Sequence, residues 1–437
     1  MDIKKTRVII RGPILTRSGY GEQARFAYRA LKTRPDLFEV YLAPTGWGNT
    51  SWIVDDSEER REIDECVHHT SHYAAECQQN NTFPWDLSIQ VTIPQEWQKI
   101  APKNIGYTAG TETTHISHKW VKSCQEVDKI IAVSEHTKAA FDNTEYEGKT
   151  DDGTLITARC TTPIDVVGFP AKNIEPQSMD FEPETDFNFL VVAQWSARKN
   201  MDVTVQGFLR AFENNPNVGL VIKTNLGKNC LLDREASFGR LKHFLDNYDT
   251  GGTLSGEPRK CKVYLLHGTM TDEEMVGLYK HPKIKALVNI AHGEGFGLPM
   301  FEAAQAGLPI IAPNWGGQKD FLNAEVTTKG KGKRKTRSRV RFLGTKVDFN
   351  INNIQKEAVW DDILIAQSKW CYPIEKSYSL ALQNVYKTYD RAVADAKKLQ
   401  KHVSEAFSED SQKSKFVESV IETLNNKTPQ KRMVLDI

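Results

Sequence analysis

The sequence predicts an α/β protein made of two domains, each built on a doubly wound parallel sheet. Short apolar runs rich in β-branched residues alternate with helical patterns along most of the 437 residues, which is typical of βαβ units. The runs are continuously apolar, as expected for strands that helices cover on both faces. The pattern stops once, at 168–186, where three prolines and several acids indicate a linker.

The first series of strands precedes this linker. The opening run RVIIR is followed by a helix that carries Ala24, Ala27, Tyr28 and Leu31 on one face. The strands are predicted at 7–11, 38–43, 87–93, 104–107, 129–134 and 164–167.

A second βα series follows the linker, with strands predicted at 189–194, 218–223, 263–267, 286–290 and 309–313. Thr271 and Glu274 form a capping-box pattern at the start of one helix. From Ser377 onward the pattern is helical. We therefore predict a first domain over 1–180, completed by C-terminal helices at about 405–437, and a second over 181–404. Two facing sheets of this kind predict a ligand cleft between the carboxyl ends of their strands.

Composition excludes several other classes. Hydrophobic residues make up 39% and charged residues 26%, as in folded globular proteins. The seven cysteines show no CxxC spacing, so neither a disulfide framework nor a zinc ribbon is expected. The N-terminal residues are polar, and no apolar run approaches the roughly 20 residues of a spanning helix. We expect a reducing, cytoplasmic compartment and no transmembrane segment.

One segment departs from the balance of 57 basic and 56 acidic residues in the whole chain. The stretch KGKGKRKTRSRVR, within a predicted insertion at 327–342, has no acid and eight basic residues, and its charge density predicts a loop. These residues are Lys329, Lys331, Lys333, Arg334, Lys335, Arg337, Arg339 and Arg341. Because the whole chain carries a net charge of +1, removing these eight charges leaves −7 on the rest. The near-zero balance therefore does not exclude a polyanionic partner.

The most informative segment is AHGEGFGLPMFEAAQAGLPIIAPNWGG, which begins at Ala291. It follows a buried strand, passes three glycines and enters a helix at Pro299, a residue suited to a first helical turn. The backbone amides of Gly295, Phe296, Gly297 and Leu298 are thus placed to bind a diphosphate. Glu294 and Glu302, separated by seven residues, flank these amides. The alternative is a glycine loop that only turns a strand into a helix.

The string GEGFGLPMFEAAQAGLPIIAPNWGG resembles the E-x7-E segment of retaining glycosyltransferases of the GT-B fold, family-four type. The resemblance implies two facing Rossmann-like domains, of which 1–180 is the acceptor side and 181–404 binds a nucleotide sugar. It implies that Glu302 holds the ribose and Glu294 the sugar hydroxyls. Gly295 to Leu298 would contact the donor diphosphate.

The resemblance also implies phosphate-binding cations after the first strand of the second domain. Ser196-Ala197-Arg198-Lys199-Asn200 stands there, and Lys199 matches the family lysine. The usual Gly-Arg is replaced by Gln194-Trp195, which leaves Arg198 as the second cation. The alternative for Arg198 and Lys199 is a solvated pair that caps a loop.

Two segments of the first domain complete the implied site. Gly19 and Gly21 form a glycine loop that approaches the donor phosphates or the acceptor in the family. The same residues match a dinucleotide fingerprint, but about eight residues separate the strand from Gly19, and no acid ends the second strand to hold a ribose.

After a later strand of this domain, Glu112 and His115 fall where the family has a polar residue facing the anomeric centre. With His118 they also suggest a polar helix start or a metal site. The chain has no D-x-D triplet, so we predict no metal ligands, no required cofactor and a metal-independent reaction.

The implied reaction transfers a sugar, with retention, from a nucleotide sugar, most readily a UDP-sugar. Glu294, Lys199, Arg198, Glu112 and His115 are the catalytic candidates. The leaving diphosphate would take the acceptor proton, and no residue is nominated as a covalent nucleophile.

The acceptor is predicted from a second resemblance. RGPILTRSGYGEQAR and QKEAVWDDILIAQSKWCYP resemble glycosyltransferases of tailed phages, some of which modify hydroxymethylated cytosine in DNA. The favoured acceptor is thus a flipped-out hydroxymethylated base, with the eight cations on the DNA backbone in the cytoplasm of the host. A saccharide, lipid or protein acceptor is the alternative, and a non-catalytic nucleotide-sugar or nucleic-acid binding module is another.

Overall fold

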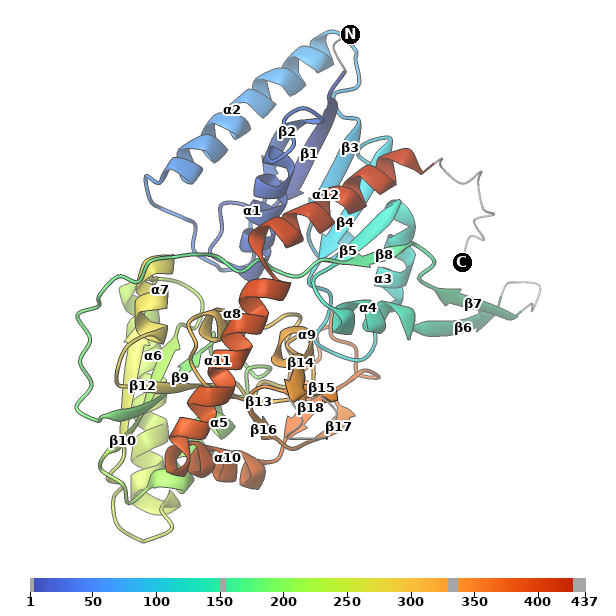
Figure 1. Ribbon diagram of the computed structural model, residues 1–437. Coiled ribbons are helices and arrows are strands. Elements are labelled where there is room, and N and C mark those ends of the chain that lie inside the picture. Colours follow the sequence, from blue (N-terminus) through green and yellow to red (C-terminus); the bar gives the residue numbers. More distant parts are fainter. Residues whose placement is uncertain (1–3, 150–154, 329–336, 427–437) are drawn as a thin grey trace. The chain divides into compact units, whose positions relative to one another are not determined.

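A computed structural model describes residues 4–149, 155–328 and 337–426. The chain divides into two compact units. Unit 1 comprises Met1–Pro170, Val359–Ser368 and Glu409–Ile437, and unit 2 comprises Ala171–Ala358 and Lys369–Ser408. Each unit is described by itself below (Figure 1).

Unit 1 contains a six-stranded sheet in the order β2-β1-β3-β4-β5-β8, and every pair in it is parallel. All six strands predicted before the linker are confirmed. Their bounds are Thr6–Gly12 (β1), Phe38–Pro44 (β2), Leu87–Val91 (β3), Lys103–Thr108 (β4), Lys129–Ala132 (β5) and Ile164–Val166 (β8). The helices are α1 (Gly19–Lys32), α2 (Glu58–Gln79), α3 (His118–Ser123), α4 (Glu135–Asp142) and α12 (Glu409–Asn425).

The C-terminal helix α12 belongs to unit 1, where it packs beside α1, an element far from it in the sequence (Figure 1). Its Phe416 ring lies 5.6 Å from the ring of Phe26 and 5.2 Å from that of Tyr107. The ammonium of Lys129, which is 2% exposed, contacts Glu422 of α12 at 2.5 Å. Both apolar contacts and a partly buried ion pair therefore tie the end of the chain to the first sheet.

Unit 2 contains a second parallel sheet, in the order β11-β10-β9-β12-β13-β16. The five predicted strands are confirmed, and β16 is an addition. Their bounds are Phe187–Val192 (β9), Val218–Thr224 (β10), Lys262–His267 (β11), Ile284–Val288 (β12), Ile310–Pro313 (β13) and Thr345–Val347 (β16). The helices are α5 (Met201–Phe212), α6 (Leu231–Asn247), α7 (Asp272–Tyr279), α8 (Leu298–Gln305), α9 (Lys319–Leu322), α10 (Glu375–Lys387) and α11 (Tyr389–Ala406).

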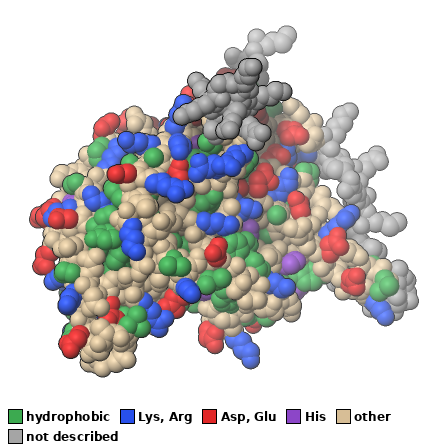
Figure 2. Space-filling view, turned by 60° about the horizontal axis from the view of Figure 1, so that its bottom comes forward, with side chains coloured by type: hydrophobic (Ala, Val, Ile, Leu, Met, Phe, Trp, Pro, Cys, Tyr) green, Lys and Arg blue, Asp and Glu red, His purple; other side chains and the backbone are tan. Residues whose placement is uncertain are grey.

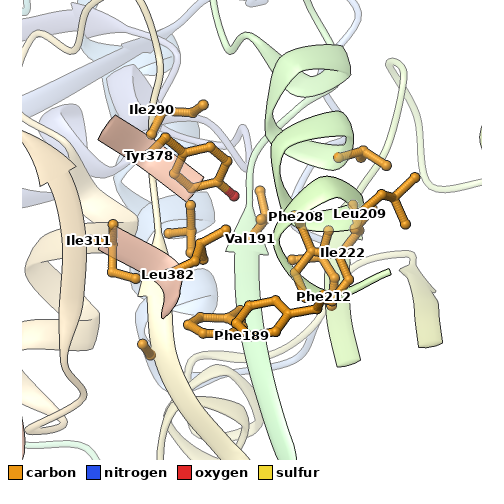
Figure 3. Packing of buried hydrophobic residues seen from close by; sticks show 14 of the residues in the cluster. Phe189, Val191, Phe208, Leu209, Phe212, Ile222, Ile290, Ile311, Tyr378 and Leu382 are labelled. Carbon is orange, nitrogen blue, oxygen red and sulfur yellow. The ribbon is translucent and has the colours of Figure 1, made fainter. Parts of the chain in front are cut away.

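The core of unit 2 is aromatic where β9 meets α5. Phe189 stacks on Phe212 with ring centres 5.5 Å apart, and Phe208 meets Phe212 at 5.6 Å (Figure 3). Tyr378 and Leu382 of α10 close the same cluster and are fully buried. The predicted capping box of α7 is confirmed, because Thr271 and Glu274 cap each other's backbone.

Among the described residues, three antiparallel strand pairs were not predicted. They pair β6 (Glu145–Lys149) with β7 (Leu155–Arg159), β14 (Asn323–Thr328) with β15 (Arg337–Phe342), and β17 (Phe349–Asn353) with β18 (Lys369–Pro373).

The predicted loop over the basic segment is wrong for 337–341, which lies in β15. Alternation in β15 puts Arg339 and Arg341 on one face, and Arg341 lies 3.4 Å from Asp395. The partner strand β14 adds no further cation and carries one acid, Glu325, so the pairing does not increase the repulsion between the basic side chains. Lys329, Lys331, Lys333, Arg334 and Lys335 lie outside the described residues.

Among the described residues, no helix is both long and apolar enough to cross a membrane. All seven cysteines carry free thiols. Acidic and basic side chains are interspersed over the face in Figure 2, in keeping with the small net charge of the chain.

Candidate functional site

The loop between β12 and α8 is built around glycine. Gly297 has a φ of +94°, a left-handed conformation that side chains disfavour, and its carbonyl accepts bonds from the amides of Met300 and Phe301. The chain therefore turns directly into α8, which begins at Leu298 with Pro299 in its first turn. The predicted strand, glycine loop and helix are confirmed.

The loop after β13 supports this turn from behind. The amide of Gly317 donates to the carbonyl of Glu294 at 2.8 Å. A Cβ atom on Gly317 would lie 1.9 Å from the carbonyl oxygen of Gly295, so only glycine fits. Gly316 adopts a φ of +90° beside it. The NWGG sequence thus fixes the backbone that carries Glu294.

Glu294 lies in a buried cluster of polar groups. Its side chain accepts from the Lys199 ammonium at 2.5 Å, from the Arg198 guanidinium at 3.4 Å and from the Asn289 amide at 2.9 Å. Burial by itself favours the neutral acid, but the charges of Lys199 and Arg198 and the hydrogen bonds outweigh it and lower the pKa of Glu294 to about 2. The carboxylate is therefore ionised at neutral pH.

The cationic loop after β9 is bonded to the Glu294 loop. The Arg198 guanidinium donates to the carbonyl of Gly293 at 2.8 Å, and the amide of His292 donates to the carbonyl of Arg198 at 2.9 Å. Asn200, with a φ of +54°, donates its side-chain amide to Ile290. The structure thus brings together Arg198, Lys199 and Glu294, which lie about 95 residues apart in the sequence.

Gln194 and Trp195 replace the Gly-Arg pair that is usual in the family, and both are uncharged. The Gln194 amide donates to the carbonyl of Leu226, and the buried Trp195 indole donates to Asp202 at 3.1 Å. Trp195 thus packs in the core of unit 2.

Glu302 lies in the second turn of α8, where Tyr279 donates its hydroxyl proton to the carboxylate at 2.9 Å. Burial of the phenol and the charge of Glu302 raise the pKa of Tyr279 well above its ordinary value, so it remains a donor. The phenol therefore orients one oxygen of Glu302.

His292 was not predicted as a site residue. Its ring stacks on Trp370 of β18 with centres 4.8 Å apart, and its Nδ1 lies 2.6 Å from the carbonyl of Cys371. Since a carbonyl only accepts, Nδ1 carries the proton. Burial lowers the pKa of His292, which favours the neutral ring. Because 79 residues separate the partners, no local pattern could reveal the contact.

In unit 1, the predicted glycine loop starts α1. The Ser18 hydroxyl caps the helix by accepting from the amide of Gly21, and a Cβ on Gly21 would lie 2.1 Å from the carbonyl of Thr16. Gly19 is exposed at the first turn. The Tyr20 hydroxyl is 2.8 Å from that of Thr108, at the end of β4.

The segment after β4 carries Glu112 and His115, and Glu112 lies near enough to Tyr20 of this loop for its charge to act on the phenol. Burial and the nearby charge of Glu112 raise the pKa of Tyr20. The ring of His115 bonds to the Thr114 hydroxyl at 2.8 Å, and its backbone amide donates to Ser368 at 3.0 Å. No three His, Cys, Asp or Glu side chains of the described residues, these included, are grouped to hold a metal ion.

Known proteins resemble this chain in structure but give no match in the sequence comparisons. No model of a protein family matches the chain, and no curated protein sequence does. Solved structures do match over nearly the whole chain. Sucrose-phosphate synthase from Thermosynechococcus elongatus has a TM-score of 0.60 at 12% identity, over 96% of this chain and 99% of its own.

Two further structures agree. HepE of Anabaena, solved in complex with UDP and glucose, has a TM-score of 0.55 at 12% identity, over 95% of this chain and 99% of its own. A glycosyltransferase from Rickettsia africae has a TM-score of 0.54 at 14% identity, over 97% and 100% of the two chains. The chain therefore has the GT-B glycosyltransferase fold with two Rossmann-like domains, which confirms the predicted fold class.

Proposed function

We propose that this protein is a retaining glycosyltransferase of the family-four type that moves a sugar from a UDP-sugar to an acceptor hydroxyl. The observation that carries the proposal is the cluster of Lys199, Arg198 and Glu294 beside the glycine turn into α8. Partly buried cations and helix N-terminal amides suit a diphosphate. HepE, which shares the fold, was solved with UDP and glucose.

The cations would act on the leaving group. As the bond between sugar and diphosphate breaks, negative charge grows on the phosphate oxygens and needs positive groups already in place. Lys199 and Arg198 are held by hydrogen bonds before any ligand arrives. The amides from Gly295 to Leu298 would add uncharged donors to the same oxygens. Arg198 would be the second cation on the phosphates, in place of the arginine of the family's Gly-Arg pair, which this chain lacks.

The two glutamates would divide the donor between them. Glu294, ionised and fixed by three donors, would accept from sugar hydroxyls. Glu302, oriented by Tyr279, would accept from the ribose. The acceptor would attack from the face that the diphosphate leaves, and a phosphate oxygen would take its proton, so configuration is retained without a covalent intermediate.

Residues 1–180, with the helices of about 405–437, would form the acceptor side. Glu112 and His115 would face the reacting sugar from the segment after β4, and the loop with Gly19 and Gly21 would approach the donor phosphates or the acceptor at the start of α1. Residues 181–404 would bind the nucleotide sugar.

The proposed acceptor is a hydroxymethylated base of phage DNA, met in the cytoplasm of the host. Its support is the charge distribution, with eight basic residues between 329 and 341 in a chain whose other residues sum to −7. The described part of this segment is one strand of a two-stranded ribbon, on which Arg339 is exposed. Such a ribbon suits contacts to a phosphate backbone.

A direct assay tests the function. Purified protein would be mixed with UDP-glucose or other nucleotide sugars and with DNA that does or does not contain 5-hydroxymethylcytosine, in buffer with excess EDTA. We expect UDP release that the modified DNA stimulates, and a mass increase of one sugar on its nucleosides. Lys199→Ala should fold normally and lose transfer.

Three results would count against it. Full turnover by Lys199→Ala would reject the site. An absolute need for a divalent ion would reject metal independence. Transfer to an oligosaccharide but not to DNA would reject the hydroxymethylated base as the acceptor.

A further inference from the structure

One segment of unit 1 lies, in the sequence, between two strands of unit 2. Residues 359–368, here named the inserted segment, belong to unit 1, although β17 before them and β18 after them belong to unit 2. Hairpin loops usually have about two to five residues, whereas residues 354–368 separate these two strands. Closing the hairpin therefore does not explain the inserted segment.

The inserted segment is anchored in unit 1 at a tight turn. The amide of Leu364 donates to the carbonyl of Trp360 at 2.8 Å, which closes the turn. Asp362, with a φ of +68°, forms an ion pair with Lys119 at 2.6 Å. Ile363 packs against a buried apolar cluster of this unit. Since the ion pair is partly exposed and adds little, the apolar contact of Ile363 is the main anchor.

The inserted segment ends at Ser368, which is fully buried. Its hydroxyl accepts from the amide of His115 at 3.0 Å and donates to the carbonyl of the same residue at 3.2 Å. A residue of a neighbouring antiparallel strand would form the same pair of bonds with its own backbone. One side chain thus replaces a strand partner for His115.

The ring of His115 is linked to the same hydroxyl. The Thr114 hydroxyl lies 3.4 Å from that of Ser368 and 2.8 Å from Nδ1 of His115. The stretch 109–117 belongs to no strand or helix, so its backbone groups need side-chain partners. Thr113 also donates to the His115 carbonyl, at 3.1 Å. Hydroxyl groups therefore fix both the backbone and the ring of His115.

We propose that Ser368 is a positioning residue for the transfer reaction, because it holds His115 in place for contact with the reacting sugar. The proposal rests on the proposed function, in which His115 faces that sugar. A group that acts on a substrate must be held within about 0.5 Å of its productive place, and a loop achieves this only with support from neighbouring side chains. Ser368 supplies that support from 253 residues away in the sequence.

The test compares two buried serines of unit 1. Ser88 is also fully buried, and its hydroxyl donates to Asn104 at 2.7 Å. It lies beside the amino end of β4, whereas His115 follows the carboxyl end of that strand. Ser368→Ala should lower kcat for UDP release at least twofold and up to about tenfold, as for the loss of one or two hydrogen bonds, with the donor KM unchanged. Ser88→Ala should keep the kcat of wild type.

A double variant separates positioning from general damage. If Ser368 acts through His115, Ser368→Ala should cause no further loss of kcat in a protein that already carries His115→Ala. An equal loss in both backgrounds would overturn the proposal. A kcat for Ser368→Ala within twofold of wild type would overturn it as well, and would leave the transferase intact.

A second variant reaches the same contact if Ser368→Ala does not fold. Ile363→Ala removes the apolar anchor of the inserted segment but leaves the Ser368 hydroxyl. It should lower kcat in the same way, and the loss should again disappear when His115 is alanine. A loss that persists there would overturn the proposal.

If wild type transfers nothing from any donor, the proposed function fails, and a measurement without substrate decides the placement of His115. Nitrogen NMR of the histidine rings in the full-length protein reports hydrogen bonding at Nδ1, and His115→Ala assigns the signals. Ser368→Ala should shift the His115 signals, whereas Ser88→Ala should not. Unchanged signals in Ser368→Ala would overturn the placement, and a shift would support it.

Discussion

The loop edges of the two units differ in the kind of chemistry that they present. In unit 2, Glu294 is 5% exposed and contacts two cations, and glycines leave its loop no space to move. In unit 1, the corresponding loops carry hydroxyls and a histidine. A buried charge cluster fits one fixed, charged ligand, whereas hydroxyl groups and a histidine ring tolerate more varied ones. The contrast agrees with a constant donor and a more variable acceptor.

The largest expected effect tests this contrast directly. Glu294→Gln should lower kcat about 10²–10³-fold, because it removes the charge that holds Lys199 and Arg198 in place. His115→Ala should lower kcat only about tenfold, since its ring hydrogen bond is to a hydroxyl. Steady-state rates of UDP release would measure both, and equal losses would remove the distinction between the two edges.

The second prediction concerns stability and pH. Since the pKa of Glu294 falls from an ordinary 4.5 to about 2 on folding, its ionised form stabilises the folded state above pH 4.5. This contribution, on the order of 1–3 kcal/mol, is lost as the pH falls from about 4.5 towards 2. Urea unfolding at pH 7 should therefore show Glu294→Gln to be less stable than wild type, with a difference that shrinks by pH 3.

An exposed ion pair of unit 1 provides the control for that measurement. Glu145 lies 3.6 Å from Arg159, and both side chains are more than half exposed. Glu145→Gln should change stability by less than about 1 kcal/mol at either pH. A difference between wild type and Glu294→Gln that stays constant from pH 7 to 3 would contradict the charge cluster.

The third prediction concerns donor binding. Tyr279→Phe keeps the ring but removes the hydroxyl that orients Glu302, so it should raise the KM for the donor about threefold to tenfold. The acceptor KM should stay the same. Tyr264→Phe is a matched control, because its hydroxyl bonds to Thr185 in the same unit. A rise in the acceptor KM alone would show that Glu302 acts on the acceptor and not on the donor.

The smallest expected effect is on salt dependence. Arg339→Ser should lower the slope of log acceptor affinity against log salt by about one, as for the loss of one phosphate contact. Lys242→Ser, which removes another exposed cation, one that is paired with Asp246, should leave the slope unchanged. Affinities measured by anisotropy between 50 and 200 mM salt, about the usual range for such slopes, would show it. Identical slopes would exclude Arg339 from the DNA contact.

Sequence patterns predicted the parts of the molecule that local rules govern. Parallel strands appear as apolar runs, and the turn into α8 requires glycine at 297 and admits proline at 299. Arg198, Lys199 and Glu294 were named from the resemblance to the glycosyltransferase motifs, and they meet because parallel strands end at one edge of a sheet. Local sequence thus identified both the fold class and the residues of the cluster.

The parts that depend on distant partners were not predicted. The stack of His292 on Trp370 joins a loop to a strand, with the two residues 78 positions apart in the sequence, and Tyr279 of α7 meets Glu302 of α8. The charge density of 337–341 suggested a loop, but these residues pair with β14, which carries the acid Glu325 and no cation. Such contacts depend on which elements pair in space, and neither composition nor periodicity encodes that pairing.

The division of the chain has a consequence for biosynthesis. Unit 1 takes the helix α12 (Glu409–Asn425) from a part of the chain that is made after all of unit 2. Until α12 leaves the ribosome, Phe26 lacks an aromatic partner and Lys129 lacks Glu422. The first unit to be synthesised is therefore the last to be completed, and a fragment ending at residue 408 should expose apolar surface and need a chaperone.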